Sequence, residues 1–298
     1  MNVTYILYNP KSGNRDGEEK IKALRELYSA RETEFINITA IDDYKAFCDG
    51  LHKSDEIVIC GGDGTLNRFV NEIYDLNLEN NIYFYAMGTG NDFLRDLDKS
   101  EGAEPFLVNE YIKELPVVTV NGRDYRFINA VGFGIDGYCC EVGDKIRSEN
   151  KKLDYTAIAI KGLLGGYKPT AARVTVDGVT KEYKKIWIAP TMFGRYYGGG
   201  MMPAPLQTRD NKEKAVSFAA IHTAGKLKTL CVFPSIFKGE HVSHSEMVDV
   251  ISGHDVTVEF DRPVALQIDG ETFLGISKYQ VRSAACVRNA DKAQAAAV

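Results

Sequence analysis

The chain has 298 residues, of which 44% are hydrophobic and 26% are charged, as in globular proteins with well-buried cores. Its net charge of -5 argues against broad electrostatic binding to nucleic acid or to anionic lipid, although this sum is compatible with a local basic patch. No window is apolar for long enough to span a bilayer, and the first residues lack the pattern of a secretory signal.

The first third of the sequence alternates between strand and helix patterns. Apolar strand patterns cover 3–9, 33–39, 55–60 and 82–86, and helical patterns cover 18–30, 42–52 and 65–76. Near-continuous apolar strands that alternate with helices indicate a parallel sheet covered on both faces. We therefore predict an open α/β domain over residues 1–114, whose ligands bind at the carboxyl ends of its strands.

From about residue 115 the pattern becomes antiparallel. Asn121-Gly122 and Asp177-Gly178 lie between alternating segments and predict two β-hairpins. Further strands are predicted over 215–223, 255–260, 264–269 and 279–287, and helices over 153–166 and 226–237. We predict a mostly antiparallel β-sandwich over residues 115–288, followed by a tail without periodicity over 289–298.

The turn GGDGT, residues 61–65, separates an apolar strand from an amphipathic helix. Glycines let successive N–H groups point into one concavity, and the helix, predicted to begin near Thr65 with Thr65 as its cap, adds its positive dipole end. This arrangement is typical of a phosphate site. Asp63 would repel phosphate by itself, so it indicates a Mg²⁺-bound nucleotide. The alternative is a plain turn in which Asp63 caps its own backbone.

Two further glycine-bearing loops follow predicted strands. NPKSGN (9–14) follows the first strand, and MGTGNDFLRDL (87–97) follows the fourth. These loops carry Lys11, Asp92 and Arg95. We expect all three loops to converge on the ligand-binding edge of the sheet.

Two other patterns are weaker. GFGIDG (132–137) satisfies G-x-G-x-x-G, but it follows a hairpin strand and does not open a βαβ unit, so we do not predict a Rossmann site. His241 and His244 lack partner ligands in the sequence and are expected to be solvent-exposed.

The motifs YNPKSG, GGDGTLNRFVN and GTGNDFLR, in this order and spacing, resemble those of the diacylglycerol kinase catalytic-domain family, in particular its bacterial soluble lipid kinases. Three later segments are similar as well: NAVGFGIDG (129–137), YYGGGMMPAP (196–205) and LQIDGE (266–271). The resemblance covers most of the chain. It implies an N-terminal α/β nucleotide-binding domain of the NAD kinase and diacylglycerol kinase type and a C-terminal β-sandwich for the lipid substrate.

The resemblance also implies roles for individual residues. Asp63 and Glu271 would be catalytic, with Glu271 as the proton acceptor, and Asp136 would join Asp63 in a catalytic Mg²⁺ network. A plain hairpin at Asp269-Gly270, with Glu271 on its rim, is the alternative. The residues implied to bind the nucleotide are Asn9, Lys11, Thr39, Gly61, Gly62, Asp63, Gly64, Thr65, Asn67, Thr89, Asn91, Asp92 and Arg95.

The chain departs from the family pattern at two places. Some members carry a lysine where this chain has Asn14. After APL the family usually has a D-D-G-L-L-D-type segment that holds a structural Mg²⁺, whereas this chain reads QTRDNKEKAVSF. Asp210 and Glu213 are the candidate ligands that remain there.

The implied activity is the ATP- and Mg²⁺-dependent phosphorylation of a lipid hydroxyl, with diacylglycerol as acceptor and phosphatidic acid as product. The alternatives are an NAD kinase-like small-molecule kinase and a non-catalytic nucleotide-binding regulator. The expected partners are a lipid substrate reached by peripheral membrane contact and a second copy in a homodimer, without nucleic acid. The six cysteines include no C-x-x-C pair, so we expect reduced thiols in a cytoplasmic protein that visits the inner membrane face.

Overall fold

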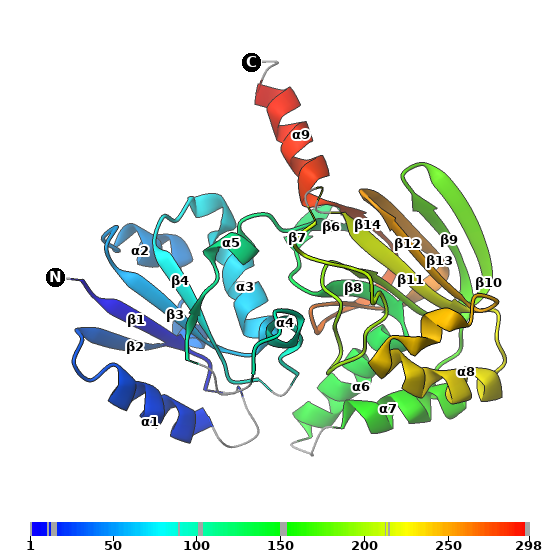
Figure 1. The fold of residues 1–298 in the computed structure, drawn as a ribbon, viewed down its shortest axis with the longest axis horizontal. Coiled ribbons are helices and arrows are strands. Elements are labelled where there is room, and N and C mark those ends of the chain that lie inside the picture. The colour runs from blue at the N-terminus through cyan, green and yellow to red at the C-terminus, as the bar shows by residue number, and fades with distance from the viewer. Residues whose placement is uncertain are drawn as a thin grey trace. The chain divides into compact units, whose positions relative to one another are not determined.

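The computed structural model describes residues 2–10, 12, 17–88, 90–100, 104–149, 154–211, 213 and 215–295. The chain divides into two compact units, Met1–Glu114 and Leu115–Val298, and each unit has its own sheet (Figure 1). The first unit is an α/β layer and the second consists mainly of antiparallel strands, so the predicted fold class is confirmed.

The first unit is built on a five-stranded sheet with the order β2-β1-β3-β4-β5. β1 to β4 run parallel, as predicted, whereas the two-residue β5 pairs antiparallel with β4 and is too short for a sequence pattern to indicate. The strands are β1 (Thr4–Tyr8), β2 (Thr33–Asn37), β3 (Glu56–Gly61), β4 (Asn81–Ala86) and β5 (Phe106–Leu107).

Helices cover both faces of this sheet. Leu24 of α1 packs with Ile6 and Val58, while the ring of Phe47 in α2 meets the ring of Tyr5 edge-on at 5.7 Å. Because neighbouring side chains of a strand point to opposite faces, Tyr5 and Ile6 mark the two covered sides. The helices are α1 (Gly17–Leu27), α2 (Tyr44–Asp49), α3 (Asp63–Ile73), α4 (Asp92–Asp96) and α5 (Asn109–Ile112), with 3₁₀ turns η1 (Ile38–Ala40) and η2 (Tyr74–Leu76).

The start of α3 differs from the prediction. The helix begins at Asp63 and its N-cap is Gly62, which has extended dihedral angles (φ -90°, ψ 179°) and supplies no side-chain hydrogen bond. Thr65 therefore lies inside the first turn, and the expectation that it caps the helix is wrong. The helix consequently begins two residues earlier than the sequence pattern indicated.

The second unit contains a nine-stranded sheet that folds on itself. Its two longest strands, β10 and β13, each pair with β9 through one part and with β8 through another. All pairings in this sheet are antiparallel, so GFGIDG does not open a parallel βαβ unit. The strands are β6 (Val117–Val120), β7 (Arg123–Arg126), β8 (Ala130–Gly134), β9 (Thr170–Val176), β10 (Val179–Met192), β11 (Val216–His222), β12 (Val248–Gly253), β13 (Asp255–Ile268) and β14 (Glu271–Arg282).

Helices pack along this sheet (Figure 1). α6 was not predicted, because its glycines interrupt the helical pattern, yet Gly137 is what allows it to lie against β13. A Cβ at Gly137 would stand 1.9 Å from the carbonyl oxygen of Ala265. The helical elements are α6 (Ile135–Ser148), α7 (Tyr155–Lys161), the π-helical η3 (Gly162–Gly166), α8 (Lys226–Val232), the 3₁₀ turns η4 (Phe233–Lys238) and η5 (Glu240–Ser243), and α9 (Ala284–Ala295).

Three predictions near the C-terminus are corrected. The strands predicted over 255–260 and 264–269 are parts of the single strand β13, whose pairing is irregular between Glu259 and Leu266. The strand predicted over 279–287 ends at Arg282. The segment 289–298, predicted to lack periodic structure, continues α9 as far as Ala295, and residues 296–298 lie outside the described part.

Candidate active site

Three loops leave neighbouring strands at one edge of the first unit's sheet. β1, β3 and β4 are adjacent and parallel, so the segments that follow them begin side by side (Figure 1). Backbone hydrogen bonding continues past the ends of these strands. The N–H of Asn9 donates to the carbonyl of Cys60 at 3.0 Å, and the N–H of Met87 donates to the carbonyl of Gly61 at 2.7 Å. The structure therefore brings together the described parts of the three glycine-bearing loops found in the sequence.

Glycines allow the second and third of these loops to touch through their backbones. A Cβ on Gly88 would lie 2.6 Å from the Cα of Gly62, closer than such atoms approach in proteins. Gly61 is confined by the first turn of α3, since its Cβ would lie 2.5 Å from the Cβ of Thr65. The spacing of the two loops thus requires residues without side chains.

Thr65 connects the first loop to the second. Its Oγ1 accepts a hydrogen bond from Nδ2 of Asn9 at 3.1 Å and lies 3.4 Å from Oγ of Ser12. Two residues predicted from separate motifs, Asn9 and Thr65, are therefore in direct contact.

Asp63 connects the second loop to the third. Its Oδ2 accepts the backbone N–H of Phe93, in the first turn of α4, at 3.0 Å. In the same helix Nη1 of Arg95 lies 3.6 Å from Oδ1 of the buried Asp92. Asp63 also stands in the first turn of α3, where a negative charge stabilises the helix. The carboxylate thus has a structural contact in addition to its charge.

The N-terminus of α3 is arranged to receive an anion. This 11-residue helix concentrates partial positive charge at its first turn, and its N-cap, Gly62, supplies no side chain. A phosphate group placed there would meet backbone N–H groups and the favourable end of the helix dipole.

Two other predicted residues, Asn67 and Asn91, belong to the buried frame of the site. Both are buried, and Asn91 adopts a left-handed conformation (φ 43°) at the start of α4. The carbonyl and Oδ1 of Asn67 accept hydrogen bonds from Nδ2 of Asn71 at 2.9 and 3.0 Å. Asn67 therefore fixes the internal structure of α3.

The remaining predicted nucleotide-binding residues have different surroundings. Gly64 lies in the first turn of α3. Thr39 is exposed in η1, where its N–H and hydroxyl both donate to Oδ1 of Asn37. Lys11 and Thr89 lie outside the described residues.

In the second unit, Asp136 is enclosed by protein. It is buried in the first turn of α6, and a Cβ at Gly132 would lie 2.6 Å from its Oδ2, so the glycine makes room for the carboxylate. Burial raises the pKa of Asp136 to about 7 and is the largest cause of the shift. Asp63 lies in the first unit and Asp136 in the second, and their shared Mg²⁺ network stays a prediction.

Glu271 follows a tightly held turn. Asp269 (φ 44°) and Gly270 (φ 88°) form the two-residue hairpin between β13 and β14, and Glu271 is the first, exposed residue of β14. The carboxylate of Asp269 accepts the backbone N–H groups of all three residues of 128–130. The turn is therefore a hairpin, and charge-assisted hydrogen bonds hold the residue two positions before Glu271. The role of Glu271 as proton acceptor stays a prediction.

A buried arginine that the sequence analysis did not identify supports the same segment. The guanidinium of Arg209 donates to the carbonyl oxygen of Ile128 and, at 2.6 Å, to Oδ1 of Asn129. Segment 128–130 is thus held by a carboxylate on its N–H side and by a cation on its C=O side. The only sequence signal was the departure of QTRDNKEK from the family pattern.

Arg209→Met is expected to lower the free energy of unfolding by about 3 kcal/mol, because it leaves two buried acceptors without their donor. Urea denaturation measures the loss. Arg173→Met is the matched control, since Arg173 is exposed and pairs with Glu182 at the surface, where such a change has little effect. Equal losses in the two variants would contradict the structural role of Arg209.

The predicted structural Mg²⁺ ligands offer no enclosed site. The side chain of Glu213 is 81% exposed and lies 3.5 Å from Nε2 of His254, and Asp210 is exposed as well. Within the described ranges, no group of three or more His, Cys, Asp or Glu side chains is placed to hold a metal ion. That site stays a prediction.

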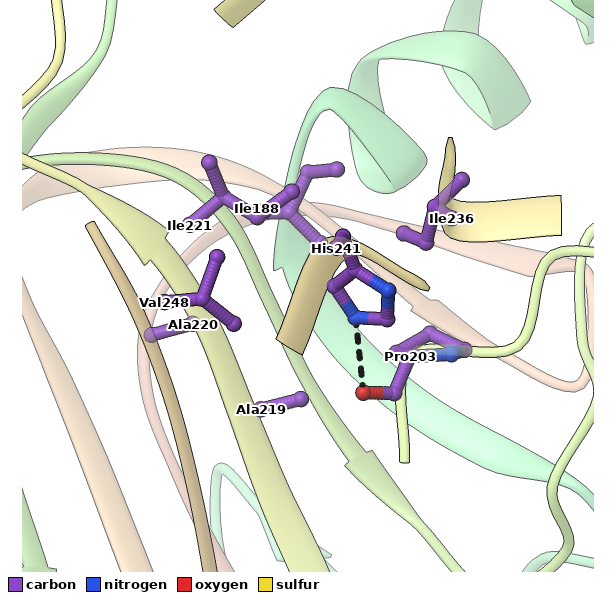
Figure 2. Close-up of a pocket in the computed structure, with 8 residues that line it drawn as sticks. All are labelled: Ile188, Pro203, Ala219, Ala220, Ile221, Ile236, His241 and Val248. Carbon is purple, nitrogen blue, oxygen red and sulfur yellow. Dashed lines mark hydrogen bonds between the residues drawn. The ribbon is translucent and has the colours of Figure 1, made fainter. Parts of the chain in front are cut away.

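His241 is buried, so the expectation that it is solvent-exposed is wrong. Nε2 of His241 lies 3.0 Å from the carbonyl oxygen of Pro203, as the dashed line in Figure 2 shows. Since a carbonyl only accepts, Nε2 carries the proton, and burial lowers the pKa of His241. The pocket around the ring is otherwise aliphatic and lined by Ile188, Pro203, Ala219, Ala220, Ile221, Ile236 and Val248 (Figure 2). It offers no second group for catalysis.

The chain matches two families of known proteins. Residues 4–119 match the diacylglycerol kinase catalytic domain, and residues 129–283 match the YegS C-terminal NAD kinase beta sandwich-like domain. The two matches together cover most of both units.

Relatives of similar length share modest identity with the chain. A diacylglycerol kinase of Bacillus subtilis (strain 168) is 24% identical over 283 residues, which cover 91% of this chain and 90% of that protein. A Staphylococcus epidermidis protein named "Putative lipid kinase" is 30% identical over 226 residues, 73% of this chain and 70% of its own length.

A solved structure supports the fold. The crystal structure of a putative diacylglycerol kinase from Bacillus anthracis str. Sterne aligns with a TM-score of 0.67 at 20% identity, over 95% of this chain and 93% of that one. Among the described residues, no helix has the length and apolar character needed to cross a membrane. The two family matches and the 30% identical relative show that the chain belongs to the diacylglycerol kinase catalytic-domain family of lipid kinases.

Proposed function

We propose that the chain transfers the γ-phosphoryl group of ATP to a lipid hydroxyl in a Mg²⁺-dependent reaction, with diacylglycerol as acceptor and phosphatidic acid as product. The observation that carries this proposal is the junction of the three loops. Asp63 accepts a hydrogen bond from the backbone N–H of Phe93, and Thr65 accepts one from the side chain of Asn9. The helix that begins at Asp63 has no side-chain cap. The α/β domain, residues 1–114, would hold the nucleotide, and residues 115–288 would hold the lipid.

The loops suit a triphosphate. The first turn of α3 supplies N–H groups and a positive dipole end, and the contact of Gly62 with Gly88 leaves no side chain between the two loops. Phosphoryl transfer depends mainly on positioning and on neutralising charge, which fixed backbone donors do without reorganisation. The proposed phosphate contacts are those of residues 61–65 and of the neighbouring Asn9, Asn91 and Arg95.

The donor chemistry at Asp63 fits Mg²⁺. Nucleotide-bound Mg²⁺ keeps several waters and takes only one or two carboxylates from the protein, so a larger cluster of ligands is not required. Asp63 would hold the ion, which when bound neutralises charge on the phosphates. Asp136 would support the same network if it ionises, although its burial favours the neutral acid.

Glu271 would accept the proton of the lipid hydroxyl. As that proton moves to the Glu271 carboxylate, the hydroxyl oxygen forms a bond to the γ-phosphorus and the bond from phosphorus to the ADP oxygen breaks. The fixed turn at Asp269 and Gly270 orients the strand that carries this residue.

A radiolabelled-ATP assay with separate acceptors tests the function. Diacylglycerol is expected to be labelled in the presence of Mg²⁺, whereas sphingoid bases, glycerol phosphate and NAD are not. Glu271→Gln is expected to lower kcat by about 100-fold without weakening ATP binding. Labelling of NAD instead would favour a small-molecule kinase, and ATP binding without any labelled acceptor would favour a non-catalytic regulator.

Gly88→Ala is expected to weaken ATP binding by about tenfold, because the added Cβ meets the Cα of Gly62 and pushes the two loops apart. Isothermal titration with Mg·ATP measures the change. Gly50→Ala is the matched control in the same unit, since its Cβ would be 3.4 Å from the nearest atom, the carbonyl oxygen of Phe47. If both variants bind ATP like the unmodified chain, the loop contact is not part of the nucleotide site.

A further inference from the structure

We propose that segment 207–215 is held in place by the guanidinium of Arg209 and by amide side chains, and that no structural Mg²⁺ binds there. The segment reads QTRDNKEKA, and the structure describes its residues 207–211, 213 and 215. This is the alternative to the metal site that the resemblance implies at Asp210 and Glu213. It concerns the fold of the second unit and does not depend on the proposed function.

The guanidinium of Arg209 is a permanent positive charge inside the second unit. Arg209 is only 5% exposed, and its guanidinium donates to the carbonyl oxygen of Ile128 and, at 2.6 Å, to Oδ1 of Asn129. Backbone and amide carbonyl oxygens are also ligands of hard divalent cations such as Ca²⁺. Because arginine stays protonated in proteins, Arg209 already supplies a cation to oxygen atoms of this kind.

The positive charge has a fixed negative counterpart. Oδ1 of Asp269 accepts the backbone N–H groups of Asn129 and Ala130 at 2.8 and 2.9 Å. The guanidinium and this carboxylate therefore hold one short segment from opposite sides. A divalent cation at the acceptors of Arg209 would be repelled by the guanidinium, so the two cations exclude each other.

Two amide side chains of the segment occupy nearby backbone carbonyls. Nε2 of Gln207 donates to the carbonyls of Phe193 and Ala215 at 3.1 and 2.9 Å. Nδ2 of Asn211 donates to the carbonyls of Thr208 and Ala215 at 2.7 and 3.3 Å. A carbonyl oxygen has two lone pairs, and that of Ala215 accepts from both amides. A metal ion would have to displace these donors to use the same oxygens.

The oxygen ends of both amides are engaged with protein as well. Oε1 of Gln207 accepts from Oγ of Ser217 at 2.6 Å, and Oδ1 of Asn211 accepts the N–H of Ala215 at 2.9 Å. These acceptor contacts fix which end of each amide carries the N–H groups. The segment is thus closed by hydrogen bonds from its own side chains.

The carboxylates of the segment lie at the surface. The side chain of Glu213 is 81% exposed, and Asp210 is exposed too. Mg²⁺ gives up its water reluctantly, so exposed carboxylates hold it weakly. The buried position is occupied by Arg209, and the carboxylates that could bind a metal stand outside it.

Urea denaturation of the full chain without nucleotide, in excess EDTA and in excess Mg²⁺, tests the proposal. The shift of the urea midpoint between the two conditions is expected to be the same for the unmodified chain and for Asp210→Ala with Glu213→Ala. An ion that binds only the folded state would stabilise it. A Mg²⁺-dependent rise in the midpoint of the unmodified chain that the double variant loses would overturn the proposal.

Arg209→Asp and Arg209→Met test whether the position holds a cation. Both remove the guanidinium, but the aspartate adds a carboxylate beside the oxygens of Ile128 and Asn129, which Ca²⁺ could join. With Ca²⁺ at about 100 times its Kd, the unfolding equilibrium constant of Arg209→Asp should fall by about 100-fold. That of Arg209→Met should respond to Ca²⁺ no more than that of the unmodified chain.

Arg173→Asp is the matched control, because Arg173 is exposed and pairs with Glu182 at the surface of the same unit. It should gain no response to Ca²⁺. Equal responses of Arg209→Asp and Arg209→Met would overturn the role of this position as a cation site. The comparison with Asp210→Ala and Glu213→Ala needs no change at Arg209, so it decides the proposal even if neither Arg209 variant folds.

Discussion

Asp63→Asn is expected to lower kcat for lipid phosphorylation by about 10³-fold while the chain stays folded. Asparagine keeps an oxygen that can accept the N–H of Phe93, so the contact between the second and third loops is preserved. The variant loses only the negative charge, which the proposed mechanism uses to hold Mg²⁺ beside the phosphates. Steady-state kinetics with saturating lipid measures the loss, and circular dichroism checks the fold.

The direction of the nucleotide-binding change separates a metal role from a purely structural one. Without Mg²⁺, Asp63→Asn should bind ATP at least as tightly as the unmodified chain, because a repulsive charge beside the phosphates is gone. With Mg²⁺ present it should bind more weakly. Asp63→Ala should change ATP binding in the same two directions. It should also lower the free energy of unfolding, since the N–H of Phe93 loses its acceptor.

Asp43→Asn is the matched control for this experiment. Asp43 is the N-cap of α2 and accepts the N–H of Ala46 at 2.9 Å, so it makes a similar contact in the same unit but outside the three loops. It should leave kcat unchanged. A kcat of Asp63→Asn within a few-fold of this control would rule out a role for the Asp63 charge in catalysis.

The sequence predicted the elements whose signals are local. The buried strands of the first unit are continuous apolar runs, and the hairpin turns contain Asn121 and Asp177, which both adopt the positive φ that such turns require. The three glycine loops were placed correctly because their strands are neighbours in a parallel sheet. These features depend on residues close together in the chain.

The missed features depend on contacts between distant residues. α6 contains Gly137, which weakens a helical pattern in the sequence but is needed because the helix backbone lies against Ala265. Arg209 and Asp269 act on the same segment, 128–130, from positions far along the chain. The burial of His241 likewise depends on Pro203, which comes from another motif. No local pattern reports such pairings.

Asp136→Asn is expected to make the chain more stable than its parent by about 4 kcal/mol at about pH 8, because a buried carboxyl whose pKa rises from 3.8 to about 7 disfavours folding once it ionises. The folded state holds the proton more tightly than the unfolded state does. The protonated carboxyl of Asp136 therefore contributes stability to the folded state. This stability is fully present below the pKa of the unfolded state and is lost as the pH rises through the pKa of the folded state.

Urea denaturation of both chains without divalent cations, from about pH 5 to about pH 8, measures this difference. The advantage of Asp136→Asn should grow across that window and become constant above the pKa of the folded state. Asp210→Asn is the matched control, since it makes the same substitution at an exposed position. If the curves for the parent and Asp136→Asn run parallel across the window, Asp136 is ionised in the folded chain at neutral pH. The carboxylate would then be charged and available for the Mg²⁺ network that the resemblance assigns to it.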